Sequence, residues 1–228
     1  MSKDGRIWLS HTGIEVLERC PRCFWLQYRR GIYHPEGIVS RLPNRFDTVL
    51  KNYFNIFRPL GELPPLVAGK LEGKLQNPFQ EKYFVRLDEK YGFFGKLDEC
   101  LVDDKEEHIP VDFKTASSDP REKEVLEAYQ SQIDDYVYIL AENGKKVAGF
   151  GYLVYFFPDH SKELHKGFPM IMHIEKLKGD PEKTKKRIQN AISILEKEIP
   201  QPAEDCPFCT WYDKVKGELP SDSRRIKR

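Results

Sequence analysis

Residues 95–115 read GKLDECLVDDKEEHIPVDFKT, and this stretch decides which fold the sequence predicts. Apolar residues on both sides of an acidic run indicate two strands, 93–102 and 108–114, joined by a charged turn. On an extended strand alternate residues share one face, so Asp112 and Lys114 point together while their neighbours point the other way. The stretch therefore predicts two adjacent strands that carry a carboxylate and a lysine on one face.

Asp98 adds a second carboxylate to this predicted face. It lies in an apolar strand, where a partly buried carboxylate needs a partner, and a neighbouring carboxylate is a partner only if a cation lies between them. Two acids and a lysine are typical of a magnesium site for phosphodiester hydrolysis, in which Asp98 and Asp112 hold the ion and Lys114 orients the nucleophile. The alternative is solvated charge, because 32% of the chain is charged and similar triplets recur at 88–90 and 103–105.

Outward from this stretch, hydrophobic periodicity and turn residues predict helices, strands, a helix, two strands and a final helix. The expected helices are 12–30, opened by a capping box and ended by Gly31, then 46–57, 125–140 and 181–197. The expected strands are 83–87, 93–102, 108–114, 147–157 and 168–174. This order is typical of an α/β or α+β domain built on one central sheet.

The composition is that of a globular protein with balanced charge. The 228 residues can bury a core, and 37 Lys and Arg against 36 Asp and Glu exclude a wholly basic nucleic-acid binder. The sequence shows neither a secretory leader nor an apolar run long enough to span a membrane, so we expect a cytoplasmic protein with no membrane partner.

The charges are segregated along the chain. Residues 176–187 hold six basic and two acidic side chains, while residues 98–107 hold six acidic side chains and one lysine. Segment 176–187 and the tail 214–228 predict phosphate contacts, or else a solvated surface.

Four of the five cysteines form two Cys-Pro-x-Cys pairs, Cys20/Cys23 and Cys206/Cys209. Five cysteines are too few for a disulfide scaffold, but two such pairs complete a tetrahedral four-sulfur site that zinc or an iron–sulfur cluster can occupy. The alternative is four buried, inert cysteines, and the fifth, Cys100, fits a packed strand position. Nearby aromatic side chains are expected to pack around the metal rather than to stack on bases: Trp25, Trp211 and Tyr212.

The run GKLDECLV…HIPVDFKT resembles the core of the PD-(D/E)XK nucleases, in the branch that includes RecB-like nucleases and the CRISPR-associated exonuclease. The resemblance implies a restriction-endonuclease-like α/β core, in which a central mixed sheet is flanked by helices. It matches Asp98 and Asp112 to the acids that hold Mg²⁺ or Mn²⁺, with the Phe113 carbonyl as a further ligand. It matches Lys114 to the lysine that activates or positions water.

The same family places a Gln and a Tyr four residues apart on the next helix, which Gln132 and Tyr136 match. This spacing puts both on one helical face, where they support the site or contact DNA, and for Tyr136 plain core packing is the alternative. The second helix of these nucleases normally supplies a histidine ligand, whereas this chain has Asp47 in the corresponding stretch. We expect Asp47 either to add a third carboxylate to the site or to be an exposed helix residue.

The opening LSHTGIEVLERCPRCFWLQY is similar to the first helix of these nucleases, in which four cysteines from the two ends of the chain bind a 4Fe–4S cluster. Their usual division is one cysteine before the core and three after it, but here it is two and two, which reopens Zn²⁺ as the occupant. We expect one domain, 1–228, with a helical N-terminal region (1–75), a catalytic sheet core (76–180), and a C-terminal helix and cysteine segment (181–228). Its N- and C-terminal segments would be joined at the cysteines.

The expected function is that of a metal-dependent DNA nuclease, an exonuclease acting on DNA ends or single strands in DNA repair, recombination or CRISPR adaptation. The sequence has no P-loop of the form G-x-x-x-x-G-K-[ST], so a helicase or a CRISPR integrase is the expected partner if the activity needs one. The alternative is a catalytically inactive DNA-binding or assembly module that keeps the nuclease fold. The missing second-helix histidine favours that alternative.

Overall fold

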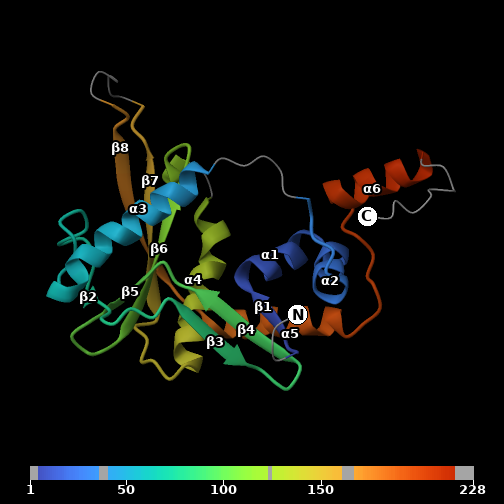
Figure 1. The fold of residues 1–228 in the computed structure, drawn as a ribbon, viewed down its shortest axis with the longest axis horizontal. Helices are drawn as coiled ribbons and strands as arrows, with labels where there is room; N and C mark the ends of the chain where they lie inside the picture. The colour runs from blue at the N-terminus through green and yellow to red at the C-terminus, as the bar shows by residue number, and fades with distance from the viewer. Residues whose placement is uncertain (1–4, 36–40, 123–124, 161–166, 219–228) are drawn as a thin grey trace, which may run out of the picture. The chain divides into compact units, whose positions relative to one another are not determined.

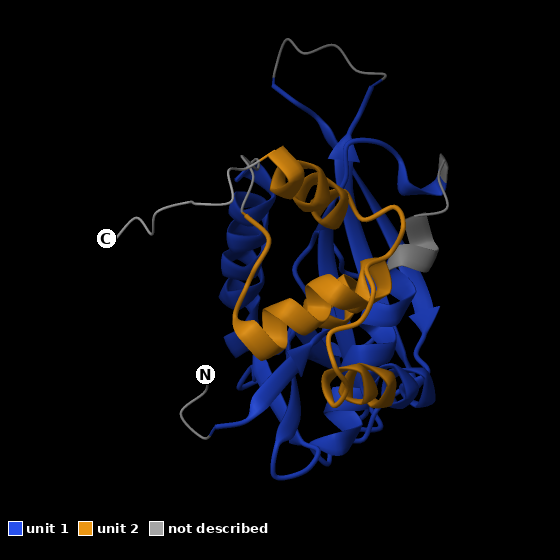
Figure 2. Ribbon diagram, turned by 90° about the vertical axis from the view of Figure 1, so that its right-hand side faces the viewer, with its two compact units in different colours: residues 1–11, 38–188 blue, residues 12–37, 189–228 orange. Residues whose placement is uncertain are grey.

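The computed structural model describes residues 5–35, 41–122, 125–160 and 167–218. The contacts within the chain divide it into two compact units, which Figure 2 colours separately. The core unit comprises residues 1–11 and 38–188, and the cysteine unit comprises residues 12–37 and 189–228. The far end of the basic tail, 219–228, lies outside the described residues. We describe each unit by itself.

The core unit contains two mixed β-sheets (Figure 1). The smaller has the order β1-β4-β3, formed by β1 (Ile7–Ser10), β4 (Tyr91–Lys96) and β3 (Lys82–Arg86). The larger has the order β2-β5-β6-β7-β8, formed by β2 (Lys74–Leu75), β5 (Glu99–Val102), β6 (His108–Thr115), β7 (Phe150–Pro158) and β8 (Met170–Lys178). The pairs β1–β4 and β6–β7 are parallel and the other pairs are antiparallel. Central β7 is almost wholly apolar because both faces of a central strand are covered.

The expected continuous strand 93–102 and the expected single sheet were both wrong. The chain leaves β4 after Lys96, bends at Asp98 and enters β5 of the other sheet. Leu97 is fully buried in this bend, and its N–H donates to the Glu81 carbonyl at 2.8 Å. Apolar residues on either side of the bend are buried in different sheets, so hydrophobicity alone gave no sign of the break. Asp98 therefore lies at the junction of two sheets and not inside a strand.

Two helices of the core unit cover its sheets. Helix α3 (Leu42–Phe57) packs on the larger sheet, where the fully buried ring of Phe54 lies 5.0 Å from the ring of Phe113 on β6. Val49, on the same helix, is 51% exposed. Helix α4 (Val125–Glu142) packs against strands of both sheets. Two 3₁₀ turns, η1 (Arg58–Leu60) and η2 (Pro120–Glu122), and the first half of α5 (Pro181–Leu195) complete the unit.

These elements make the core unit an α/β structure with mixed sheets flanked by helices, and this confirms the predicted α/β class. A buried ion pair supports the junction between the sheets, since both terminal guanidinium nitrogens of Arg58 contact Glu99, at 2.6 and 3.1 Å. Burial raises the pKa of Glu99, and the guanidinium offsets some of that rise. Among the described residues, no helix is both long enough and apolar enough to cross a lipid bilayer.

The cysteine unit contains most of α1 (His11–Arg19), α2 (Pro21–Arg30), the second half of α5 and α6 (Pro207–Glu218). The single helix expected over 12–30 is two helices, because Cys20 is extended (φ −163°) and Pro21 begins α2 without an N–H for a preceding turn. Gly31 ends α2 in the left-handed conformation (φ 64°), which confirms the predicted stop. A side chain at Gly13 would collide with the Tyr28 hydroxyl, so glycine permits the close approach of α1 and α2.

Candidate functional site

The core unit has a cavity of about 380 Å³ at the junction of its two sheets. Its walls come from the start of α3, the bend between β4 and β5, the end of β6 and the middle of α4. All the acidic-site residues expected from the sequence line it: Asp47, Asp98, Asp112, Phe113, Lys114, Gln132 and Tyr136. We call this cavity the acidic pocket.

Asp112 on β6 is the most buried polar residue of the acidic pocket, at 1% exposure. Its Oδ1 accepts a hydrogen bond from the Gln132 amide at 2.8 Å and lies 3.1 Å from the Tyr136 hydroxyl. Its Oδ2 lies 2.6 Å from the Lys114 ammonium, on the same face of β6 as the alternation predicted. Burial raises the pKa of Asp112 to about 6, although Lys114 lowers it, and the nearby Asp98 carboxylate raises it further.

Helix α4 supplies the two side chains that hold Asp112 in place. The Lys114 ammonium donates to the Gln132 side-chain oxygen at 2.7 Å, and the Gln132 amide also donates to the Tyr136 hydroxyl at 2.7 Å. Burial strongly raises the pKa of Tyr136, whose hydroxyl lies 3.1 Å from the Lys96 carbonyl. The ring of Tyr136 is buried, but its hydroxyl belongs to the polar cluster, so the residue does more than fill the core.

Asp98 faces the acidic pocket from the bend between the sheets. Its Oδ2 accepts a hydrogen bond from the Phe113 N–H at 3.1 Å, and its Oδ1 lies 2.8 Å from the Lys51 ammonium. The same ammonium lies 2.9 Å from Asp47, one helical turn earlier on α3. Burial would lower the pKa of Lys51, but Asp98 and Asp47 together raise it. Sequence reasoning missed Lys51, for which the only local signal was its i, i+4 spacing from Asp47.

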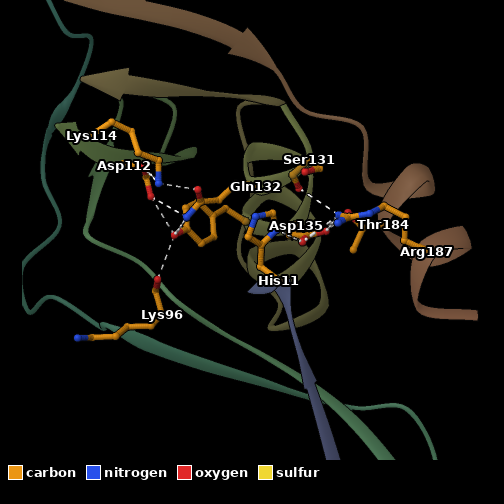
Figure 3. Close-up of polar contacts among 10 residues, drawn as sticks. His11, Lys96, Asp112, Lys114, Ser131, Gln132, Asp135, Thr184 and Arg187 are labelled. Carbon is orange, nitrogen blue, oxygen red and sulfur yellow. Dashed lines mark hydrogen bonds and ion pairs between the residues drawn. The ribbon is translucent and has the colours of Figure 1, made fainter. Parts of the chain in front are cut away.

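A second polar cluster lies on another side of α4, around Asp135, which is 2% exposed (Figure 3). Asp135 accepts hydrogen bonds from Thr184 at 2.8 Å and from Arg187 at 3.0 and 3.1 Å, and it pairs with His11 Nδ1 at 2.8 Å. Figure 3 shows Gln132 directed toward Asp112, while Asp135 is directed toward Thr184 and Arg187. The two clusters together fix the rotation of α4 about its own axis.

The basic segment 176–187 is partly neutralised within the core unit. It includes the end of β8 as well as the start of α5. Lys176 pairs with Glu72 at 2.6 Å, and Lys185 pairs with Glu182 at 2.8 Å. Together with Arg187 in the Asp135 cluster, these contacts account for three of the six basic side chains. These contacts offset part of the positive charge of the segment.

The four paired cysteines meet in the cysteine unit, which confirms their predicted convergence. Their Sγ atoms all lie within 4.8 Å of one another, with Cys23 at 3.6 Å from both Cys206 and Cys209 and Cys20 at 3.9 Å from Cys209. All four are buried and free of disulfides. Among the described residues, they form the only group of three or more His, Cys, Asp or Glu ligand atoms at such short range. They could hold a zinc ion or an iron–sulfur cluster.

Both Cys-Pro-x-Cys pairs lie at helix N-termini. Cys20 is the N-cap of α2, and Cys206 directly precedes Pro207, the first residue of α6. Although burial raises the pKa of Cys20, hydrogen bonds with the Cys23 and Ala203 backbone lower it to about 7. A helix N-terminus also favours the thiolate that binds a metal. The remaining cysteine, Cys100, is fully buried in β5, as expected.

Aromatic side chains of the cysteine unit line a cavity of about 470 Å³ next to the cysteines. The rings of His34 and Phe208 stack there at 3.7 Å. Trp211 and Tyr212 are 65% and 54% exposed and line this cavity together with Cys23 and Cys209. Trp25, in contrast, is buried, and its indole N–H donates to the Lys197 carbonyl at 2.9 Å.

Comparisons with known proteins found a similar solved structure but no matching family or curated protein. No protein-family model matches the sequence, and no curated protein matches it. Among solved structures, the crystal structure of SSO0001 is similar, with a TM-score of 0.49 and 15% identity over 94% of this chain and 88% of that one. The functional interpretation therefore depends on the residues of the two sites.

Proposed function

We propose that the core unit is a metal-dependent deoxyribonuclease of the PD-(D/E)XK type. The observation that carries this proposal is the joint position of Asp98, Asp112 and Lys114 around one cavity. It is supported by Gln132 and Tyr136, whose contacts with Asp112 are those that a family resemblance would lead one to expect. A buried carboxylate with a raised pKa in a cavity is more typical of a functional site than of a structural one.

The donor atoms of the acidic pocket fit a hard divalent cation. Asp112 Oδ2 is buried, and its partner among the described residues is the Lys114 ammonium, 2.6 Å away. A buried carboxylate oxygen in this condition is a ready ligand, and carboxylate oxygens are the ligands that Mg²⁺ and Mn²⁺ prefer. Asp98 and Asp112 would hold the ion, with the Phe113 carbonyl as the expected further ligand. Such an ion lowers the pKa of bound water and polarises a phosphoryl oxygen.

The protein's own residues have distinct roles in this proposal. Lys114 places a positive charge beside Asp112, where it can orient a nucleophilic water or stabilise negative charge that develops on phosphate. Gln132 bridges Lys114 and Asp112, so it holds the acid and the lysine in a fixed relation. The Tyr136 hydroxyl donates to Asp112 Oδ1, whereas Asp112 Oδ2 points in another direction. We propose DNA ends or single strands as the substrate.

The experiment is a cleavage assay of the purified full chain with Mg²⁺ or Mn²⁺ on labelled single- and double-stranded DNA. Asp112→Asn should lower cleavage by about a hundredfold or more, because it removes one metal-binding charge. Asp104→Asn, the same change in an exposed turn, is the matched control and should cut like the parent. Equal cleavage by the two variants, or intact DNA with the parent protein, would refute a nuclease that acts alone. Activity that appears only with a helicase or integrase would identify a subunit.

A catalytically inactive DNA-binding module is the second candidate, and one observation favours it. Asp47 replaces the usual histidine and is bound by Lys51. This candidate predicts salt-sensitive DNA binding that Asp98→Asn and Lys114→Met leave unchanged, with no cleavage under any metal condition. Binding and cleavage assays on the same variants separate the two candidates.

For the cysteine unit we propose a structural metal centre that joins its N-terminal and C-terminal segments. Three of the Sγ separations are 3.6 to 3.9 Å and all lie within 4.8 Å, which favours a single tetrahedral ion such as zinc, whose Zn–S bonds of about 2.3 Å place neighbouring sulfurs about 3.8 Å apart. The 4Fe–4S cluster implied by the resemblance needs wider spacing, because each thiolate binds a different iron. A colourless protein with one zinc per chain would support the zinc ion, and a brown protein with charge-transfer absorbance would support the 4Fe–4S cluster.

A further inference from the structure

A lysine ammonium lies between two of the three carboxylates of the acidic pocket. Lys51 Nζ is 2.8 Å from Asp98 Oδ1, 2.9 Å from Asp47 Oδ1 and 3.0 Å from Asp47 Oδ2. The side chain is only 19% exposed, and it begins one helical turn after Asp47 on α3. Its charge is therefore held at the acidic pocket and not dispersed in solvent.

The contacts of the three carboxylates differ in a way that matters for metal binding. Asp47 has both oxygens near Lys51. Asp98 has one oxygen near Lys51 and the other in a hydrogen bond with the Phe113 N–H. Asp112 has Oδ2 at 2.6 Å from the Lys114 ammonium. Each carboxylate therefore already has an ammonium neighbour, and Lys51 is the one that Asp98 and Asp47 share.

We propose that Lys51 is a resident cation of the acidic pocket, which competes with a divalent ion for Asp98 and keeps Asp47 out of the set of metal ligands. The inference rests on the proposed metal site and assigns a role to Lys51, which is not one of the proposed metal ligands. It means that Asp47 replaces the usual histidine in sequence but not in function. Two positive charges a few ångströms apart repel each other strongly, so Lys51 lowers the affinity of the pocket for the divalent ion.

The experiment measures Mn²⁺ binding to the full chain by isothermal titration calorimetry, without DNA. Lys51→Met keeps the length of the side chain and removes the charge, so it should bind Mn²⁺ about tenfold more tightly than the parent. The gain should be smaller in Lys51→Met/Asp47→Asn, because that variant frees Asp98 from the ammonium but has no Asp47 carboxylate to offer the ion. Lys70→Met, at an exposed turn position, is the matched control and should bind like the parent.

The single variant Asp47→Asn tests the same inference without altering Lys51. Its affinity for Mn²⁺ should differ from that of the parent by less than about threefold, since a partly exposed carboxylate already paired with Lys51 contributes little. Asp112→Asn should abolish the binding. An Asp47→Asn protein that binds as weakly as Asp112→Asn would overturn the inference, and so would Lys51→Met binding no more tightly than the parent. If circular dichroism shows that Lys51→Met is unfolded, the Asp47→Asn comparison decides alone.

Failure of the proposed metal site gives a different pattern. If the parent binds no Mn²⁺ that depends on Asp112 but Lys51→Met does, the proposed metal site of the parent fails and the resident cation is upheld. If neither protein binds Mn²⁺, both proposals fail. If the parent binds one ion and Lys51→Met binds it equally well, only the role of Lys51 fails.

Discussion

Replacing Asp112 by Asn should make the protein more stable at neutral pH. The carboxylate is 1% exposed, and burial raises its pKa from 3.8 to about 6 even with Lys114 beside it. A folded state that raises the pKa of an acid binds its proton more tightly than the unfolded chain does, so ionisation of Asp112 opposes folding. Asn has nearly the same shape and carries no charge, so it removes this cost.

The magnitude follows from the pKa values. One pKa unit corresponds to about 1.36 kcal/mol, so the rise from 3.8 to about 6 corresponds to an upper limit of about 3 kcal/mol at pH 7. The cost is absent below pH 3.8, where Asp112 is neutral in both states, and it grows as the pH rises to about 6. Above that value it is constant. The Asn variant should therefore match the parent near pH 4 and exceed it at pH 7.

Urea denaturation followed by circular dichroism measures this difference, at several pH values and without added Mg²⁺ or Mn²⁺. The absence of divalent ions matters, because an ion bound to Asp112 would stabilise the parent alone. Asp104→Asn is the control, since its side chain is exposed and its effect should not depend on pH. An Asp112→Asn protein that is less stable than the parent at pH 7 would refute the reasoning. A stability difference that is the same at pH 4 and pH 7 would refute it too.

Three further changes test other regions of the structure. Cys206→Ser should lose the metal of the cysteine unit, measured as metal per chain by mass spectrometry, whereas Cys100→Ser should retain it. Asp135→Asn should lower the free energy of unfolding by about 3 kcal/mol, since it removes the carboxylate that Arg187 contacts twice, and a loss below about 1 kcal/mol in urea would contradict this. Phe54→Ala should cost about 3–5 kcal/mol by leaving a cavity against β6, and unchanged thermal stability would contradict that packing role.

The features of the site that follow local periodicity could be predicted from the sequence. Asp112 and Lys114 share a face because β6 is a regular strand, and Gln132 and Tyr136 share a face because α4 is a regular helix. The cysteine pairs could be predicted to meet because a four-thiol site needs both. None of these inferences requires knowledge of the path of the chain between the elements.

The features that depend on distant contacts could not be predicted. Strand β1 is four residues long and pairs with β4, more than 80 positions later, so nothing local marks it as a member of a sheet. The break at Asp98 divides one apolar run between two strands that belong to different sheets. Lys51 meets Asp98 only because α3 packs on the larger sheet, and its i, i+4 spacing from Asp47 is equally common on exposed helices.

The division of the cysteine unit between residues 12–37 and 189–228 has a consequence for how the protein is made in the cell. Cys23 and Cys206 are 183 positions apart, so at ribosomal rates of about 5–20 residues per second roughly 10–40 s separate their synthesis. During that interval Cys20 and Cys23 have only each other as ligands and are open to oxidation or to capture of the wrong metal. Loading of the proposed metal centre must therefore follow translation of residue 209, so the metal that is free at that moment would decide which centre forms.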